Sequence, residues 1–205
     1  MRYIIKRGSM DVTYISGGLF VSNGRWTHPR TTLEDYELVI VLKGRFYMEI
    51  GGEKREFQEG DCFLLFPGEE HCGVGAAWNV SFYWLHFRMQ GEEVVYGDSH
   101  GQTLHKQVQE REWGFFVFHE RCRPEDLTQL AVLVNQLLYY QSLYKKTREP
   151  VRPCDIMMEM TLYELARVTR NIQPKNIQAE KPDEETAMDK IYDYIRANCY
   201  KNLQI

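Results

Sequence analysis

Long hydrophobic runs are missing from this sequence of 205 residues. Its purely apolar stretches, such as 38–42 and 63–66, fall far short of the roughly 20 residues that a bilayer-spanning helix needs, so we expect no transmembrane segment. The first ten residues carry charges but no apolar core of the kind found in secretory signals. We therefore expect a cytoplasmic protein that makes no contact with a membrane.

Cysteine is scarce and irregularly spaced. The number of cysteines is odd and no two are separated as CxxC, which argues against both a disulfide framework and a cysteine-based zinc site. They stand at positions 62, 72, 122, 154 and 199. In a reducing compartment we expect them to be small, partly buried thiols.

A surplus of one charge and the common catalytic motifs are also absent. The 25 basic and 29 acidic residues give a net charge of −4, so no basic surplus indicates a nucleic-acid surface. The sequence has no GxSxG, no glycine-rich loop for a phosphate and no HExxH. These absences predict that the chain is not an enzyme and has no catalytic residues.

Phenylalanine and tryptophan are absent from the last part of the chain. All ten Phe and all four Trp lie at or before Phe118, and Tyr is the only aromatic residue after Cys122. With 43% hydrophobic and 13% aromatic residues overall, the first part can bury a substantial core. This change in composition predicts a domain boundary near Pro124.

Before this boundary, short apolar or alternating segments are separated by turn residues. Residues 45–50 alternate between apolar and polar side chains, and the following Gly51-Gly52 allows the positive φ of a tight hairpin. Residues 79–88 are apolar on both faces, so we expect that strand to be covered on both sides. Many short strands with regular turns predict an antiparallel sandwich or barrel over residues 1–123.

After the boundary the hydrophobic period becomes that of a helix. Residues 124–147 begin with a proline and two acids, which suit the positive end of a helix dipole, and a second amphipathic helix is predicted over 153–171. We expect the helix pair at 124–171 to form a homodimer, because the first helix has an apolar stripe too long for a barrel of this size to cover. The stripe consists of Leu130, Val134, Leu137 and Leu138. The predicted fold is mainly β with a helical C-terminal part (α+β).

The last part of the sequence divides again. Residues 172–185 are polar and include prolines, which is typical of an exposed linker. A final helix is predicted over 186–205, with an apolar face for which the remaining sequence offers no partner.

Two strings in the first part resemble the two halves of the cupin signature, which marks a small double-stranded β-helix barrel. Glu37 is followed seven residues later by Gly44, and Gly60 opens the string GDCFLLFPGEEH, which ends at His71. The order of barrel, helix pair, linker and terminal helix is similar to that of AraC/XylS-type transcriptional regulators. The resemblance implies a cupin-like effector-binding barrel, two dimerisation helices, a linker and the first helix of a helix-turn-helix domain, MDKIYDYIRANCYKNLQI.

This resemblance also implies partners. Regulators of this type bind a small effector, often a sugar, and bind DNA through a domain that follows the linker. Since both recognition helices would lie beyond Ile205, we expect the sequence to be truncated at the start of that domain, with DNA binding left to a longer parent protein. Residues 185–205 carry three basic and three acidic residues, so we expect residues 1–205 alone to have no sequence-specific DNA affinity.

Several residues are candidates for the effector pocket, for which we expect a sugar or sugar acid. Arg30 stands where sugar sensors of this family place an arginine, whose planar donors suit a carboxylate or a pair of hydroxyls; a surface position is the alternative. Trp84 matches a tryptophan on which such sensors stack a sugar ring, with plain core packing as the alternative. His71 follows a Pro-Gly turn at the barrel mouth. Further wall candidates are Trp26, Tyr36, Tyr47 and Phe82.

A metal site is less well supported by the sequence. Cupin enzymes that resemble this barrel bind a metal through two His and a Glu in the first half of the signature and one His in the second. Here positions 31–33 are Thr-Thr-Leu, which leaves only Glu37 and His71 in ligand positions, with His86 as an outside candidate. Because a catalytic metal wants at least three converging protein ligands, we expect no metal and no cofactor.

Two other functions stay open at this point. One is a metal-dependent cupin enzyme, an isomerase or oxygenase with a helical extension, which would carry its metal through purification. The other is a dimerisation module whose barrel holds no ligand, because side chains can fill the interior of a small barrel.

Overall fold

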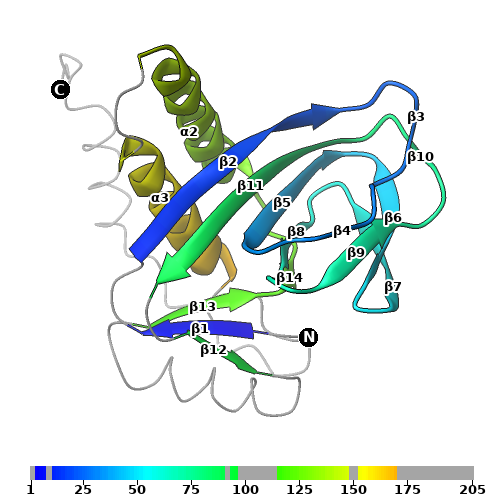
Figure 1. The fold of residues 1–205 in the computed structure, drawn as a ribbon, viewed down its shortest axis with the longest axis horizontal. Helices are drawn as coiled ribbons and strands as arrows, with labels where there is room; N and C mark the ends of the chain where they lie inside the picture. Colours follow the sequence, from blue (N-terminus) through cyan, green and yellow to red (C-terminus); the bar gives the residue numbers. More distant parts are fainter. Residues whose placement is uncertain (1–2, 8–10, 91–92, 97–114, 148–151, 170–205) are drawn as a thin grey trace, which may run out of the picture. The chain divides into compact units, whose positions relative to one another are not determined.

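The structure is a computed structural model, and most of its described residues lie in strands (Figure 1). The residues that it describes are 3–7, 11–90, 93–96, 115–147 and 152–169. The chain divides into two compact units, Met1–Ile172 and Gln173–Ile205, and every described residue belongs to the first. The predicted linker at 172–185 and the predicted helix at 186–205 lie outside the described residues.

The described strands precede two helices in the chain. The strands are β1 (Tyr3–Arg7), β2 (Asp11–Val21), β3 (Arg25–Trp26), β4 (Thr31–Thr32), β5 (Tyr36–Lys43), β6 (Arg45–Ile50), β7 (Glu53–Gln58), β8 (Cys62–Leu65), β9 (Glu70–Gly73), β10 (Ala77–Trp78), β11 (Ser81–Gln90), β12 (Glu93–Tyr96), β13 (Phe115–His119) and β14 (Arg121–Cys122). The helices are α2 (Thr128–Thr147) and α3 (Arg152–Thr169). Neither of these two helices is long and apolar enough to cross a bilayer.

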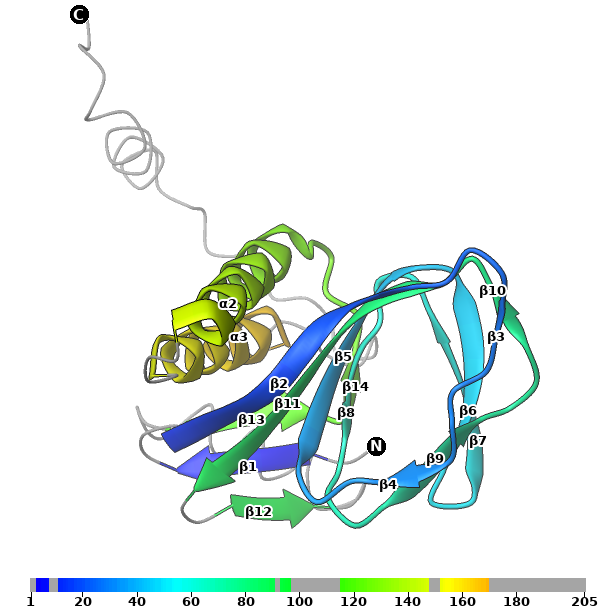
Figure 2. The same ribbon diagram turned by 45° about the horizontal axis from the view of Figure 1, so that its top comes forward.

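Two antiparallel sheets face each other and form the barrel (Figure 2). One has five strands in the order β14-β8-β5-β11-β2, and the other has four in the order β4-β9-β6-β7. Both sheets contribute side chains to one buried cluster, which we call the barrel cluster. Its members are Val39, Val41, Phe46, Met48, Ile50, Phe57, Phe63, Leu65, Ala77, Val80 and Phe82. The expectation of a mainly β, cupin-like barrel followed by two helices is confirmed.

The central strands of the five-stranded sheet bury both of their faces. In β5, Val39 belongs to the barrel cluster, whereas its neighbours Leu38 and Ile40 belong to a second cluster on the other side of the sheet. The paired strand β11 divides in the same way, with Phe82 in the barrel cluster and Leu85 in the second one. The expectation of a strand covered on both sides is therefore confirmed, although the strand runs over Ser81–Gln90 rather than 79–88.

The two helices cover the outer face of this sheet (Figures 1 and 2). The second cluster contains side chains of β2, β5, β11, α2 and α3, and among them Leu130, Val134 and Leu137 have no exposed surface. Leu138 is partly buried beside them. The premise that this stripe exceeds what the barrel can cover is therefore wrong, because the sheet and α3 bury it within a single chain. The outer face of the five-stranded sheet is apolar as well as the inner one, so the helices are needed to cover it.

Polar contacts fix α2 to strand β2 at Gly17. The side-chain amide of Gln141 accepts a hydrogen bond from the N–H of Gly17 at 3.1 Å and donates one to the carbonyl oxygen of Gly17 at 3.0 Å. The hydroxyl of Tyr14 donates to the same Gln141 oxygen at 2.7 Å. Because a Cβ at Gly17 would lie 2.7 Å from this hydroxyl and 2.8 Å from the carbonyl oxygen of Trp84, only glycine fits there.

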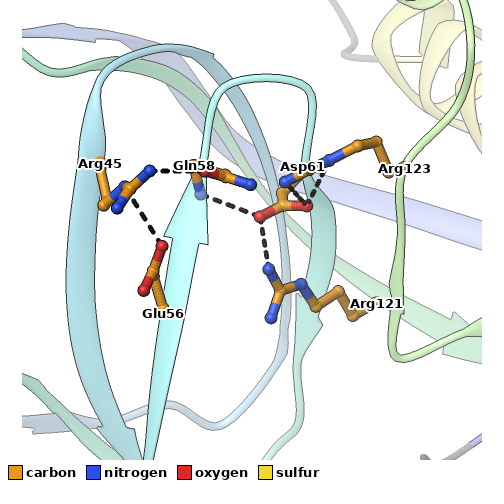
Figure 3. A network of polar contacts seen from close by, with 6 residues as sticks. All are labelled: Arg45, Glu56, Gln58, Asp61, Arg121 and Arg123. Carbon is orange, nitrogen blue, oxygen red and sulfur yellow. Dashed lines mark hydrogen bonds and ion pairs between the residues drawn. The ribbon is translucent and has the colours of Figure 1, made fainter.

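A buried carboxylate connects the barrel to the chain that leads into α2 (Figure 3). Asp61 is 2% exposed and follows the turn after β7. One of its oxygens accepts from the N–H of Gln58 at 2.8 Å and from Arg121 at 2.6 Å, and the other accepts from Arg123 at 2.8 Å. Charge-assisted bonds of this kind are stronger than neutral ones. Asp61 therefore ties the β7–β8 turn to β14.

Candidate functional site

Three side chains with ligand atoms meet beside the barrel cluster. Glu37 lies near the start of β5, His71 lies in β9, and His28 lies in the loop between β3 and β4. One ligand atom from each residue lies within 4.8 Å of the other two. Glu37 is 6% and His71 is 1% exposed, while His28 is partly buried. We call these three residues the His-Glu-His cluster.

Hydrogen bonds define which nitrogen of each imidazole carries the proton. The Nδ1 of His28 lies 2.8 Å from the carbonyl oxygen of Pro29, and the Nδ1 of His71 lies 3.2 Å from that of Glu69. A carbonyl oxygen can only accept, so in the neutral rings both Nδ1 atoms are protonated and both Nε2 atoms keep a lone pair. The Nε2 of His71 is buried and has no hydrogen-bond partner.

A third histidine and a second carboxylate lie close to Glu37. The Nδ1 of His86 lies 2.9 Å from a carboxylate oxygen of Asp35, and its Nε2 lies 3.9 Å from a carboxylate oxygen of Glu37. Burial raises the pKa of Glu37 to about 7, with His86 opposing and Asp35 adding to the shift. Burial lowers the pKa of His71, so that near neutral pH its imidazole is uncharged.

Two tryptophans adjoin this polar group. The ring of Trp26 lies 5.8 Å from that of His28, and the ring of Trp84 lies 5.5 Å from that of His86, measured between centroids. Both indoles pack against the barrel cluster and are only partly buried. A Cβ at Gly18 would lie 3.1 Å from the Trp84 ring, so glycine at this position lets the indole lie against strand β2. The arrangement presents apolar ring faces next to hydrogen-bonding groups.

The other pocket residues predicted from the sequence lie in different parts of the structure. Phe82 is buried in the barrel cluster and its ring stacks on Phe20 with centroids 4.9 Å apart, so it forms the floor beneath Trp26. Tyr36 belongs to the opposite, helix-facing cluster, and its assignment as a wall of the barrel interior is wrong, because adjacent residues of a strand point to opposite faces. Tyr47 is 46% exposed. Arg30 lies at the surface, where it forms an ion pair with Glu70.

A cavity lies outside the barrel. It has a volume of about 390 Å³ and lies between α2, α3 and β13, where Leu133, Met160, Tyr163 and Phe116 contribute to its lining. The Phe116 and Tyr163 rings meet edge to face with centroids 4.5 Å apart. Glu164 and Arg167 also line it and pair with each other, so its lining offers no unpaired charge. The lining of this cavity is therefore mainly apolar, apart from Gln129 and this ion pair.

His28 is the residue that sequence reasoning does not place in the site. It precedes the Thr-Thr-Leu segment that stands in the usual ligand positions, so the pattern does not mark it as a partner of Glu37 and His71. Two long-range contacts bring it there: Thr31 pairs with His71, and the N–H of Gly73 donates to the carbonyl oxygen of His28 at 2.9 Å. A glycine close after His71 is the local signal, but it does not reveal which loop approaches it.

The barrel and the chain leading into α2 match a known family. Residues 18–131 match the sequence model of the AraC-like ligand binding domain, and this match covers more than half of the chain. The chain belongs to the AraC-like ligand binding domain family. Its barrel interior, with the His-Glu-His cluster, falls within the matched residues.

Individual relatives share parts of this AraC-like chain. The uncharacterized HTH-type transcriptional regulator YisR of Bacillus subtilis (strain 168) is 32% identical over 75 residues, which are 36% of this chain and 26% of YisR. The chain thus matches about a quarter of the length of this relative. Among solved structures, ToxT from Vibrio cholerae strain SCE256 is 9% identical over 97% of this chain and 69% of its own, with a TM-score of 0.40. KdgF from Halomonas sp. is 20% identical over 43% of this chain and 81% of its own, with a TM-score of 0.32.

Proposed function

We propose that this chain is the effector-sensing and dimerisation region of a DNA-binding transcriptional regulator, and that its effector is a sugar or sugar acid. The observation that carries the proposal is the His-Glu-His cluster beside two tryptophans in an otherwise apolar barrel of the AraC-like ligand binding family. Burying a polar group without a partner costs on the order of 1–3 kcal/mol. A polar ligand supplies the missing partner to His71, whose Nε2 has none.

The chemistry of the site favours a polyhydroxylated ligand. Glu37 and the two unprotonated Nε2 atoms can accept hydrogen bonds from hydroxyl groups, and the Trp84 indole offers a flat face for the C–H side of a sugar ring. Trp26 provides a second aromatic surface beside His28. Arg30 would meet a ligand at the rim only, where a ligand carboxylate would replace Glu70 as its partner.

A thermal-shift screen of sugars and sugar acids tests this proposal. A ligand that binds only the folded state raises its stability by RT ln(1 + [L]/Kd), which is about 2.7 kcal/mol at a concentration of 100 Kd. Trp84→Ala should abolish the shift found with the wild type. Trp78→Ala is the matched control, because Trp78 is 61% exposed and lies outside the barrel cluster. Equal ligand-induced shifts in both variants would place the pocket elsewhere.

The proposed homodimer uses the outward faces of the two helices. Leu130, Val134 and Leu137 are covered within one chain, whereas Val132 and Tyr139 lie on the same side of α2 and are 55% and 56% exposed. Ile156 and Met160, one turn apart on α3, are 48% and 47% exposed. Apolar side chains exposed in this way are candidates for burial between two copies. Sedimentation analysis of Val132→Glu at tens of micromolar should show more monomer than the wild type.

DNA binding is proposed for the longer protein rather than for residues 1–205. We propose the domain division 1–123 for the barrel, 124–171 for the helix pair, 172–185 for a linker and 186–205 for the first helix of a DNA-binding domain. A mobility-shift assay with residues 1–205 should give no competitor-resistant band on the promoter of the longer protein, because sequence is read by recognition helices that contact base edges. A sharp band would place DNA contacts in the barrel or the helix pair.

A further inference from the structure

The His-Glu-His cluster has the donor set of a transition-metal site. Two imidazoles and one carboxylate are the ligands of many zinc and non-haem iron centres, which keep further coordination positions open. The three ligand atoms come from three separate segments and lie within 4.8 Å of one another. Since donor atoms on a tetrahedral ion are about 3.3 Å apart, modest side-chain rotations are enough to close them around it.

The hydrogen bonds of His28 and His71 leave the Nε2 lone pair of each ring available to a metal ion. Ligand histidines in metal sites donate their other N–H to a carbonyl or carboxylate, which fixes the tautomer and aims the lone pair. The Nδ1 atoms of His28 and His71 both face backbone carbonyl oxygens, at 2.8 and 3.2 Å. The remaining Nε2 of His71, in a side chain that is 99% buried, has no hydrogen-bond partner. An ion at that nitrogen would remove the cost of the unpaired lone pair.

The surroundings hold the ligands in place. His86 stands 3.9 Å from the Glu37 carboxylate and is itself fixed by Asp35 at 2.9 Å, as outer partners of metal ligands are. On the other side, Gly73 brings the backbone of His28 against β9, where a Cβ would lie 2.5 Å from the His28 nitrogen. His28 supplies the imidazole that Thr31 and Leu33 cannot supply from the positions where cupin enzymes carry the HxH pair.

We propose that His28, Glu37 and His71 bind one divalent first-row transition-metal ion, whose remaining positions are open to water or to oxygen atoms of a small effector. The proposal does not depend on the effector being a sugar. It replaces the sequence-based expectation of no metal, because that expectation counted only two converging ligands and the structure brings a third.

The test is a titration of the chelator-treated full chain, residues 1–205, with Co²⁺, whose visible absorption reports coordination, and with Zn²⁺ by calorimetry. We expect about one site per chain, with Zn²⁺ displacing Co²⁺, and no comparable binding of Mg²⁺, which prefers oxygen ligands. His28→Ala and Glu37→Gln should each weaken Zn²⁺ binding about 100-fold or more. Glu70→Gln is the matched control, since Glu70 is an exposed carboxylate next to His71 in the chain.

His28→Ala keeps the test decisive even if changes at buried Glu37 impair folding, because His28 lies in a loop and is only partly buried. Unchanged Zn²⁺ affinity in a folded His28→Ala variant would overturn the proposal, as would a wild type that binds no more Zn²⁺ than Mg²⁺. Repeating the sugar screen on chelator-treated protein separates the two proposals. If a sugar raises the thermal stability but no metal binds, the effector proposal stands and the metal proposal fails. If a metal binds but no sugar raises the thermal stability, the metal proposal stands and the sugar proposal fails.

Discussion

Gly73, the last residue of β9, donates its backbone N–H to the carbonyl oxygen of His28 at 2.9 Å, and this contact joins a strand to a loop that is distant in the chain. The approach is so close that a Cβ at Gly73 would lie 2.5 Å from the backbone nitrogen of His28 and 2.9 Å from the methyl group of Thr27. The neighbouring atoms belong largely to backbone, which cannot rotate away. The position of His28 beside His71 therefore depends on the absence of a side chain at residue 73.

Gly73→Ala should displace the loop that carries His28. We expect a loss of about 1–3 kcal/mol in the free energy of unfolding, the usual range for overpacking, measured by urea denaturation. Gly24→Ala is the control, because a Cβ there meets nothing within 4 Å and the residue has no positive φ. The control should change stability by no more than about 0.5 kcal/mol. Equal stabilities of the two variants would mean that the loop yields without cost.

Asp61→Ala should destabilise the barrel, because it leaves the Gln58 N–H and two guanidinium groups without their shared acceptor (Figure 3). We expect a cost of about 1–3 kcal/mol, moderated because Arg121 and Arg123 are partly exposed and can turn to water. Glu56→Ala, which removes the exposed ion pair with Arg45 at 3.1 Å, should cost less than about 1 kcal/mol. Denaturant midpoints measured at the same pH compare the two, and similar losses would count against a special role of Asp61.

Gln141→Ala should loosen the attachment of α2 to β2. The change removes both hydrogen bonds to Gly17 and the acceptor of the Tyr14 hydroxyl, for which we expect a loss of about 1–3 kcal/mol. Gln136→Ala is an exposed position in the same helix and makes the same change in helix propensity. Its effect should stay within about 0.5 kcal/mol. Thermal unfolding of the pair isolates the contribution of the contact from that of the helix.

Leu137→Ala should lower the stability of the single chain, whereas Val132→Ala should weaken association. Leu137 has no exposed surface, so its truncation should cost about 2–5 kcal/mol by opening a cavity between sheet and helices. Val132 is 55% exposed, so its truncation should leave the stability of the single chain almost unchanged and weaken the proposed dimer. Denaturation at low protein concentration and sedimentation at high concentration measure the two quantities separately. If Leu137→Ala is as stable as the wild type but monomeric, Leu137 contributes to the dimer interface rather than to the core of the single chain.

Local patterns in the sequence predict several of the strands and both helices, but not which elements pack against each other. The alternation over 45–50 and the turn glycines predict the β6–β7 hairpin, and the helical period predicts both helices to within a few residues. The start of α2 lies at Thr128 rather than near Pro124, because Asp126 accepts a hydrogen bond from the Thr128 N–H at 2.8 Å and closes a turn before the helix. Such a short-range competition between turn and helix is difficult to resolve from periodicity.

The sequence predicts less of the candidate site than of the secondary structure. An apolar stripe such as that of Leu130 and Leu137 indicates that one face of the helix is buried. It does not indicate whether the sheet of the same chain or a second copy of the chain covers that face. Glu37 and His71 could be found from their spacing within known strings, whereas the approach of His28 depends on the pairing of β4 with β9. Tyr36 and Glu37 are neighbours in sequence and face opposite clusters, so one residue of error in the strand phase reverses the assignment.

Strand β2 separates the barrel interior from the helix layer, and at Gly17 and Gly18 it does so without a side chain on either face. The Trp84 indole lies against the peptide at Gly18 on one side, while Gln141 grips the peptide at Gly17 on the other. Elsewhere in the sheet, flexible side chains on both faces can absorb a small displacement of a neighbouring group. Here the partition is bare main chain, so we expect a displacement of the indole from inside the barrel to act directly on the peptides to which helix α2 is bonded.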